Sequence, residues 1–169
     1  MTPVRSLSLR IALGQSCAVL IGAAPPAGDN EQPEKIGEAF AAAKEFELYS
    51  PDPDPVPKGG ENFHGWNIPR KTLLKSEDAV KVRDAVEKAR KDSNGDVAGC
   101  FSPRHGIRII REKGTVDPVI CFACLSGAVF EGKSRIGAFL TAATPGPILK
   151  DVLVAAKVPA PARERPGSP

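Results

Sequence analysis

Three apolar stretches separated by two short turns constrain the fold of this chain more than any other feature of its sequence. The stretches cover residues 106–112, 116–130 and 136–141, and the turns are Lys113–Gly114 and Glu131–Lys133. Strands joined by short turns must pair in an antiparallel way, so this region predicts an antiparallel sheet. Within it, Val119–Leu125 is apolar without interruption, which is typical of a central strand that is covered on at least one face.

Two amphipathic helices are predicted, one on each side of these stretches in the sequence. The first is capped by Ser76 and ends before Asn94–Gly95, and the second covers Pro147–Lys157. The predicted fold class is therefore α+β, a small antiparallel sheet packed by two helices as a two-layer sandwich, with extended or disordered tails. The core is expected to contain Val82, Val86, Ile109, Val119, Phe122, Phe139, Leu149 and Val152.

Composition divides the chain into four parts. They are residues 1–23, a signal peptide; residues 24–61, an acidic helix over Glu34–Tyr49 and a Pro-rich linker; residues 62–158, the globular domain; and residues 159–169, a Pro-rich tail. In the first part, Arg5 and Arg10 precede an uncharged apolar segment that is shorter than the ~20 residues of a membrane-spanning helix. We expect an exported protein, periplasmic or secreted, with no transmembrane segment in the mature chain. We expect no lipid anchor at Cys17, because polar residues precede it.

Charge and motifs exclude several functions. The chain has 23 Lys and Arg against 20 Asp and Glu, a formal charge of +3, and its aromatic content is 5%. Neither value favours nucleic acid as a partner. No nucleophile motif or phosphate loop is present, so no catalytic residue is predicted. We expect a small structural or protein-interaction domain, rather than an enzyme, with a protein as its partner.

One cluster of residues can carry chemistry. If the hairpin turns at Lys113–Gly114, strand pairing places His105 opposite residues 122–124, next to Cys121 and Cys124. Cys100 lies beyond a bend and can fold back toward them. The four side chains match a Cys3His zinc set, which makes a metal-binding domain the alternative function. Against zinc, residues three apart on a strand point to opposite faces of the sheet.

Two other interpretations of the cysteines compete with zinc. A Cys-x-x-Cys redox site is disfavoured, because in an extended strand the two Cα atoms lie ~10 Å apart, beyond the ~7 Å limit for a disulfide. A structural role is favoured, either as a disulfide from Cys100 to Cys121 or Cys124, or as buried thiols.

A second candidate site is an anion site made by Arg104, His105 and Arg108. Arg104 and Arg108 share a face of an extended chain, and Gly106 between them allows close approach to the backbone. The competing interpretation is a solvated strand edge protected by charged side chains.

Three motifs of the chain resemble those of a group of bacterial proteins. The motifs are Phe63-His-Gly-Trp66, Cys100-Phe-Ser-Pro-Arg-His-Gly-Ile107 and Val119-Ile-Cys-Phe-Ala-Cys124. They resemble an uncharacterised family of secreted or lipoprotein-like proteins that carry Cys-Phe-x-Pro-Arg-His-Gly-Ile and Val-Ile-Cys-Phe-x-Cys. The resemblance covers residues 47–158 and implies a single exported domain. It supplies no reaction, cofactor or catalytic residue.

Overall fold

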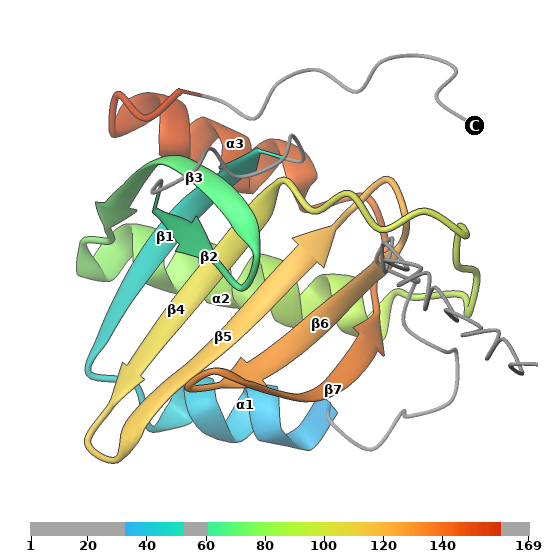
Figure 1. Cartoon of the computed structure of the whole chain (residues 1–169), viewed down its shortest axis with the longest axis horizontal. Helices are drawn as coiled ribbons and strands as arrows, with labels where there is room; N and C mark the ends of the chain where they lie inside the picture. The colour runs from blue at the N-terminus through green and yellow to red at the C-terminus, as the bar shows by residue number, and fades with distance from the viewer. Residues whose placement is uncertain (1–32, 53–60, 160–169) are drawn as a thin grey trace, which may run out of the picture.

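A computed structural model describes residues 33–52 and 61–159, which form one seven-stranded antiparallel sheet and three helices (Figure 1). The helices are α1 (Pro33–Ala41), α2 (Ser76–Lys91) and α3 (Gly146–Ala155). The strands are β1 (Glu45–Asp52), β2 (Asn62–Phe63), β3 (Trp66–Leu73), β4 (His105–Arg111), β5 (Gly114–Cys121), β6 (Ser126–Glu131) and β7 (Ser134–Leu140). Their order in the sheet is β2-β3-β1-β4-β5-β6-β7.

The predicted fold class is wrong, because the sheet is large and strongly curled and has three helices rather than two (Figure 1). Part of the error lies in the first half of the chain. The helix predicted over Glu34–Tyr49 ends at Ala41, and β1 follows it in the middle of the sheet, between β3 and β4. The stretch predicted to precede the globular domain therefore supplies a helix and a central strand.

Local sequence explains why β1 is a strand. After the Ala-rich stretch, Phe46 and Leu48 alternate with Glu45, Glu47 and Tyr49, which is the two-residue period of a half-buried strand. Leu48 is fully buried on the helix-covered face. Ile36, Phe40, Ala43 and Glu47 also recur at helical spacing, so the predicted helix was extended over these alternating residues.

The main core lies between the three helices and one face of the sheet (Figure 1). Helix α1 contacts α2, β4 and β5, and α2 contacts α3. The helix-facing residues of the central strands include Ile107, Ile109 and Ile120, none of which is exposed. All eight residues predicted for the core are buried, so that prediction is confirmed.

The other face of the sheet is partly covered by the β2–β3 hairpin, which curls over it (Figure 1). A second apolar cluster forms there around Tyr49, Phe63 and Val119. Phe63 comes from the hairpin, whereas Tyr49 and Val119 come from β1 and β5. The β2–β3 edge of the sheet therefore packs against β1 and β5 near the middle of the same sheet. The polar residues described below lie under this hairpin.

The β4–β5 hairpin has a different register from the predicted one. Arg111 pairs with Gly114, so the turn consists of residues 112–113. His105 consequently pairs with Ile120 instead of residues 122–124. The strand predicted over residues 97–101 is absent, and that part of the chain is a loop between α2 and β4. The predicted signal peptide, most of the Pro-rich linker (residues 53–60) and the Pro-rich tail after residue 159 lie outside the described residues.

Candidate functional site

The candidate functional site lies where β5 ends and the chain turns toward β6. Cys121 is the last residue of β5, and residues 122–125 form a turn before β6 begins at Ser126. Leu125 has a left-handed φ of 54°, which is uncommon for a residue other than Gly. The turn therefore interrupts the apolar run that was predicted to be one continuous strand.

A disulfide joins Cys121 and Cys124 across this turn. Their Cα atoms are 5.1 Å apart, within the range that a disulfide needs. The ~10 Å separation expected for an extended strand is wrong, because the chain between the two residues is folded back. The backbone N–H of Cys124 donates a hydrogen bond to Sγ of Cys121 over 3.2 Å.

The loop between α2 and β4 brings Cys100 to this disulfide. The loop passes beside the β5–β6 turn (Figure 1), and the N–H of Ala98 donates to the carbonyl of Cys124 over 3.1 Å. Sγ of Cys100 lies 3.4 Å from Sγ of Cys124. Further along the loop, the Phe101 ring packs edge-on against Trp66, with centroids 5.6 Å apart. Contacts on both sides of Cys100 therefore hold the loop in place, at Ala98 against the β5–β6 turn and at Phe101 against β3.

The three sulfur-bearing residues form a group that we call the cysteine site: Cys100, Cys121 and Cys124. The disulfide partners are buried, with exposed fractions of 2% for Cys121 and 1% for Cys124, whereas Cys100 is an exposed free cysteine. An exposed thiol thus lies next to a buried disulfide. Chemically, this arrangement provides a nucleophile, an electrophilic sulfur and a leaving group in one place.

His105 is not part of this group. It pairs with Ile120, and side chains of paired residues lie on the same face, so its ring faces the helices. There it packs against Phe122, with ring centroids 5.2 Å apart. The alternation along β5 directs Cys121 to the opposite face. The structure thus brings together three of the four residues predicted as a zinc set and directs His105 elsewhere.

The surroundings of His105 keep its ring uncharged. Burial, and to a smaller extent the charge of Arg104, lower the pKa of His105 to about 4. Neither ring nitrogen has a hydrogen-bond partner among the described residues. A neutral imidazole that faces the helix layer cannot attract an anion by charge.

Arg108, another member of the predicted anion site, is fully engaged elsewhere. Its Nε and Nη2 donate to the carboxylate of Asp117, and the Nη2–Oδ2 distance is 2.7 Å. Its Nη1 donates to the hydroxyl of Tyr49 over 3.1 Å. The hydrogen bonds to Asp117 raise the pKa of Arg108 above its usual value. The three predicted residues therefore do not converge on one anion.

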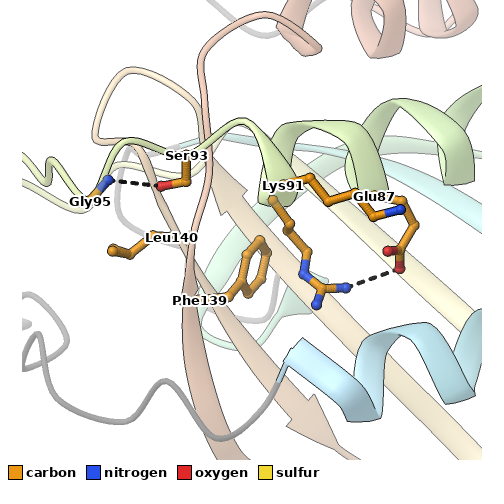
Figure 2. Close-up of a pocket in the computed structure, with 7 residues that line it drawn as sticks. Glu87, Lys91, Ser93, Gly95, Phe139 and Leu140 are labelled. Atoms are coloured by element: carbon orange, nitrogen blue, oxygen red, sulfur yellow. Dashed lines mark hydrogen bonds and ion pairs between the residues drawn. The ribbon is translucent and has the colours of Figure 1, made fainter.

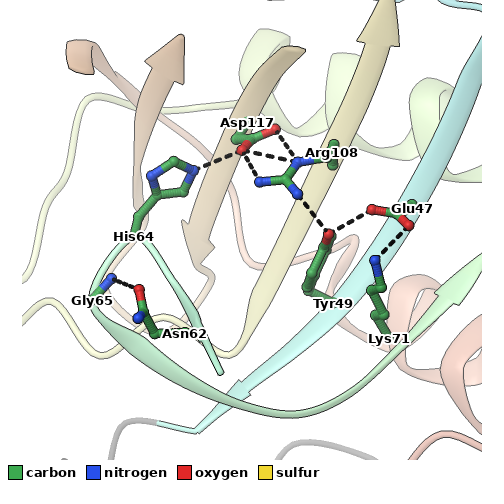
Figure 3. Close-up of polar contacts among 8 residues, drawn as sticks. All are labelled: Glu47, Tyr49, Asn62, His64, Gly65, Lys71, Arg108 and Asp117. Atoms are coloured by element: carbon green, nitrogen blue, oxygen red, sulfur yellow. Dashed lines mark hydrogen bonds and ion pairs between the residues drawn. The ribbon is translucent and has the colours of Figure 1, made fainter. Parts of the chain in front are cut away.

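Six polar side chains form a continuous chain of contacts on the hairpin-covered face, which we call the Asp117 network (Figure 3). Its members are His64, Asp117, Arg108, Tyr49, Glu47 and Lys71. At its centre, Asp117 has no exposed side-chain surface and accepts from both His64 and Arg108. An ionised carboxylate only accepts hydrogen bonds, so Nε2 of His64 carries a proton and donates a hydrogen bond to Asp117.

The outer end of the Asp117 network reaches solvent. The Tyr49 hydroxyl donates to Glu47 over 2.5 Å, and Nζ of Lys71 donates to the same carboxylate over 2.7 Å. Burial and the hydrogen bond to Glu47 raise the pKa of Tyr49 well above its usual value. For Glu47, burial acts to raise the pKa, but the hydrogen bonds from Lys71 and Tyr49 outweigh it and lower the pKa. Every member therefore has a partner of matching chemistry.

Aromatic stacking fixes the hairpin over this network. The His64 ring stacks on Phe130, with centroids 3.9 Å apart, and Phe63 stacks on Tyr49 at 4.1 Å. His64 has a left-handed φ of 54°, followed by Gly65 at 96°. The conformation of the hairpin turn thus places the His64 ring against β5 and β6. The network therefore joins the β2–β3 hairpin to the sheet.

Sequence reasoning missed the Asp117 network, although a signal was present. Asp117 stands between Val116 and Pro118, in a stretch predicted to form a strand and directly before the segment predicted to be covered on at least one face. A charged residue there requires a partner. Its partners come from segments 9 and 53 residues away, and no local pattern specifies the second of them.

A pocket of about 370 Å³ lies between the end of α2 and β7 (Figure 2). Phe139 forms its apolar wall, and Arg90 and Glu87 from α2 form part of its polar rim. Nη1 of Arg90 donates to Glu87 over 3.0 Å, so this cation is already paired. The pocket therefore presents no convergent set of unpaired polar groups that would define a ligand.

In residues 33–52 and 61–159, no group of three or more His, Cys, Asp and Glu side chains is arranged to hold a metal in this disulfide form. None of the described helices has the length and apolar character needed to cross a membrane. Comparisons with family models, with curated proteins and with solved structures find no match for this chain. The functional assignment must therefore come from the geometry of the site.

Proposed function

We propose that this protein is a thiol–disulfide exchange domain and that the cysteine site carries the reaction. The observation behind the proposal is the 3.4 Å separation between Sγ of Cys100 and Sγ of Cys124. Reacting atoms held ~3–3.5 Å apart are near the attack distance, so the loop has removed most of the entropic cost of bringing them together. Cys124 is bonded to Cys121, which gives the attack a leaving group.

The internal step is balanced without any other reactant. The Cys100 thiol loses its proton to solvent, and the thiolate attacks Sγ of Cys124. A Cys100–Cys124 bond forms as the Cys121–Cys124 bond breaks, and Cys121 leaves as a thiolate that takes up a proton. One disulfide and one thiol are present before and after the step.

The backbone supports Cys121 as the leaving group. The N–H of Cys124 already donates to its sulfur over 3.2 Å. A hydrogen bond to the charged form of a group stabilises that form, so this contact strengthens as charge develops on Cys121. The turn therefore favours attack at Cys124.

Exchange moves the disulfide from a buried to an exposed position, because Cys100 is exposed and Cys121 is not. An external thiol can then attack Sγ of Cys100 and form a mixed disulfide, with Cys124 leaving as a thiolate. A second external thiol attacks the outer sulfur and releases an external disulfide. In the net reaction two external thiols are oxidised and the cysteine site is reduced to three thiols. A cysteine of a partner protein and a small thiol such as glutathione share this chemistry.

The proposal includes export to the periplasm or the exterior, as residues 1–23 predict. Disulfides persist in those compartments and are rare in the cytosol. The same segment contains Cys17, which must be replaced in any experiment that counts thiols.

The test is the rate at which glutathione reduces the disulfide in the full chain with Cys17→Ser. We expect one free thiol at the start and three at the end, and peptide mapping should find both Cys121–Cys124 and Cys100–Cys124 bonds during the reaction. Cys100→Ser should retain the first disulfide and lower the rate by at least ~10-fold, because glutathione must then reach buried sulfurs.

Ser102→Ala is the matched control, since it changes an exposed residue of the same loop and leaves Cys100 in place. Its rate should equal that of the parent chain. An equal rate for Cys100→Ser and the parent chain would refute the proposal.

A further inference from the structure

We infer that the reduced cysteine site binds one zinc ion through the sulfurs of Cys100, Cys121 and Cys124, with a fourth position open to solvent. The inference rests on the proposed function in one respect, since the disulfide must open before the sulfurs can act as thiolate ligands. It adds a ligand and a redox-dependent change in binding to that function.

The distance between the sulfurs of Cys100 and Cys124 suits two ligands of a single metal ion. Three thiolates that bind one zinc ion at ~2.3 Å lie about 3.8 Å from one another in tetrahedral geometry. Sγ of Cys100 is already 3.4 Å from Sγ of Cys124, so this pair needs to separate by only a few tenths of an ångström. Reduction frees Cys121 and Cys124 to separate from bonding distance while they remain on the same turn.

The backbone of the turn has features that a zinc-binding turn requires. Cys-x-x-Cys is the spacing with which two sulfurs of one turn bind zinc. The left-handed residue that closes the turn is Leu125, and the N–H of Cys124 donates to Sγ of Cys121. Hydrogen bonds of this kind orient the ligands of a metal. Cys100 adds a third sulfur from a separate loop that is hydrogen-bonded to the turn through Ala98.

The disulfide form cannot bind zinc in this way. Two of the three sulfurs are bonded to each other, and a metal requires thiolates. The redox state of one bond therefore decides whether the three ligands exist, and zinc in turn stabilises the reduced state.

The exposed position of Cys100 places the fourth coordination position at the surface. His105, the other ligand predicted from the sequence, faces the helix layer against Phe122. Three protein ligands with an open position accept water or a small anion or thiol, whereas closed four-ligand sites are structural. The expected fourth ligand is therefore exchangeable.

The test is zinc binding by the full chain with Cys17→Ser, fully reduced with a phosphine and compared with the disulfide form. Calorimetry should give one zinc per reduced chain and no binding by the disulfide form. Cobalt as a spectroscopic probe should give a sulfur-to-metal charge-transfer band. Cys100→Ser should weaken zinc binding by ~100-fold or more, because losing a ligand costs more than the 10–100-fold lost with a ligand's hydrogen-bond partner.

His105→Ala is the matched control, and its zinc affinity should equal that of the parent chain. A comparable loss in His105→Ala would overturn the three-cysteine assignment, and so would a reduced chain with three titratable thiols that binds no zinc. Neither result would contradict the proposed function, which the rate of reduction by glutathione tests separately. Conversely, a disulfide that glutathione does not open, in a chain that binds zinc after phosphine reduction, would refute the proposed function alone.

Discussion

The Asp117 network and the cysteine site each contain one residue of β5, Asp117 and Cys121, but the chemical groups of the two sites are satisfied to different degrees. In the middle of the strand, Asp117 receives hydrogen bonds from His64 and Arg108, and Arg108 uses all three of its nitrogens. At the end of the strand, three sulfurs compete for one disulfide bond. Every side chain of the network has a partner, whereas in the disulfide form the cysteine site has one sulfur outside the disulfide bond.

This difference separates a structural role from a reactive one. A buried polar network in which every group is paired has one favourable arrangement, so it fixes the geometry of the hairpin on the sheet. Cys124 lies within reach of both Cys121 and Cys100, so the site has more than one disulfide arrangement as well as a reduced form, and its sulfurs can exchange. We therefore expect substitutions in the Asp117 network to change the free energy of unfolding, and substitutions in the cysteine site to change reactivity.

The largest expected effect is that of Asp117→Asn. Removal of the charge leaves Arg108 without its ion-pair partner, and the amide group that replaces one oxygen cannot accept the hydrogen bonds of Arg108 and His64 that this oxygen received. Breaking a buried ion pair on one side costs about 3–5 kcal/mol, and the partial exposure of Arg108 favours the lower end of that range. Urea unfolding followed by the fluorescence of Trp66 should measure the loss in the free energy of unfolding.

Lys71→Met is the control at the exposed end of the same network. The Lys71 side chain is 47% exposed, and exposed ion pairs contribute up to about 1 kcal/mol. The comparison fails if Asp117→Asn costs no more than Lys71→Met. It also fails if the folded Asp117→Asn protein reacts with glutathione at a rate different from that of the parent chain.

The pH dependence of stability tests His105, whose ring nitrogens have no hydrogen-bond partner in the described part of the chain. His105 has a pKa of about 4 in the folded chain, against about 6.5 when unfolded. Between these values the unfolded chain binds more protons, so the free energy of unfolding rises with pH there and falls as pH decreases. The loss from pH 7 to pH 4 should be about 3 kcal/mol from this residue.

His105→Phe should remove this contribution while preserving the ring contact with Phe122. Unfolding measured at pH 4, 5, 6 and 7 gives the difference between the parent chain and the variant at each pH. The difference should favour the variant increasingly toward pH 4. A difference that is constant across this range would mean that His105 titrates normally in the folded chain.

A smaller effect is expected where the hairpin closes over the sheet. A Cβ added at Gly106 would lie 2.5 Å from Cε1 of Phe63, whose ring is held against Tyr49. Gly106→Ala should therefore cost about 1–3 kcal/mol of unfolding free energy, as overpacking does. Gly99→Ala, at a position where nothing lies within 4 Å of the added Cβ, should change it by less than about 0.5 kcal/mol. Equal effects in a chemical-denaturation experiment would show that the hairpin is not closed over β4.

The sequence allowed prediction of α2, β4 and β7, because hydrophobic periodicity and turn residues define them locally. It predicted β5 and β6 as one strand over residues 116–130, because no turn residue marks the break between them. It did not reveal β1, where a helical stretch runs directly into an alternating one. Nor did it reveal that the β2–β3 hairpin curls over the sheet, because the contacts that hold it, such as His64 with Asp117, span 53 residues. Export, the resemblance to a secreted family and a role in protein interaction remain predictions.

The candidate site was only partly predictable, for two physical reasons. Its three cysteines were singled out together, but a continuous apolar run gave no sign that the chain turns after Cys121, since the left-handed residue there is Leu125 rather than Gly. The predicted register of the β4–β5 hairpin was also wrong, because Gly114 belongs to β5 and not to the turn. Counted from Arg111–Gly114, the pairs place His105 opposite Ile120, and this removes it from the cysteines.

The smallest expected effect on stability is that of Cys100→Ser, and this variant sharpens the comparison most. Cys100 is exposed, and its replacement leaves both the Cys121–Cys124 disulfide and the backbone bond from Ala98 to Cys124 intact. The free energy of unfolding should therefore change by less than about 0.5 kcal/mol, as for other surface substitutions. Cys124→Ser, by contrast, removes the disulfide and a buried sulfur and should cost about 2–4 kcal/mol. Urea unfolding of the two variants under non-reducing conditions measures both. If Cys100→Ser destabilised the chain as much as Cys124→Ser, the sulfur of Cys100 would make a structural contact like those of the Asp117 network. The contrast between the Asp117 network and the cysteine site would then disappear.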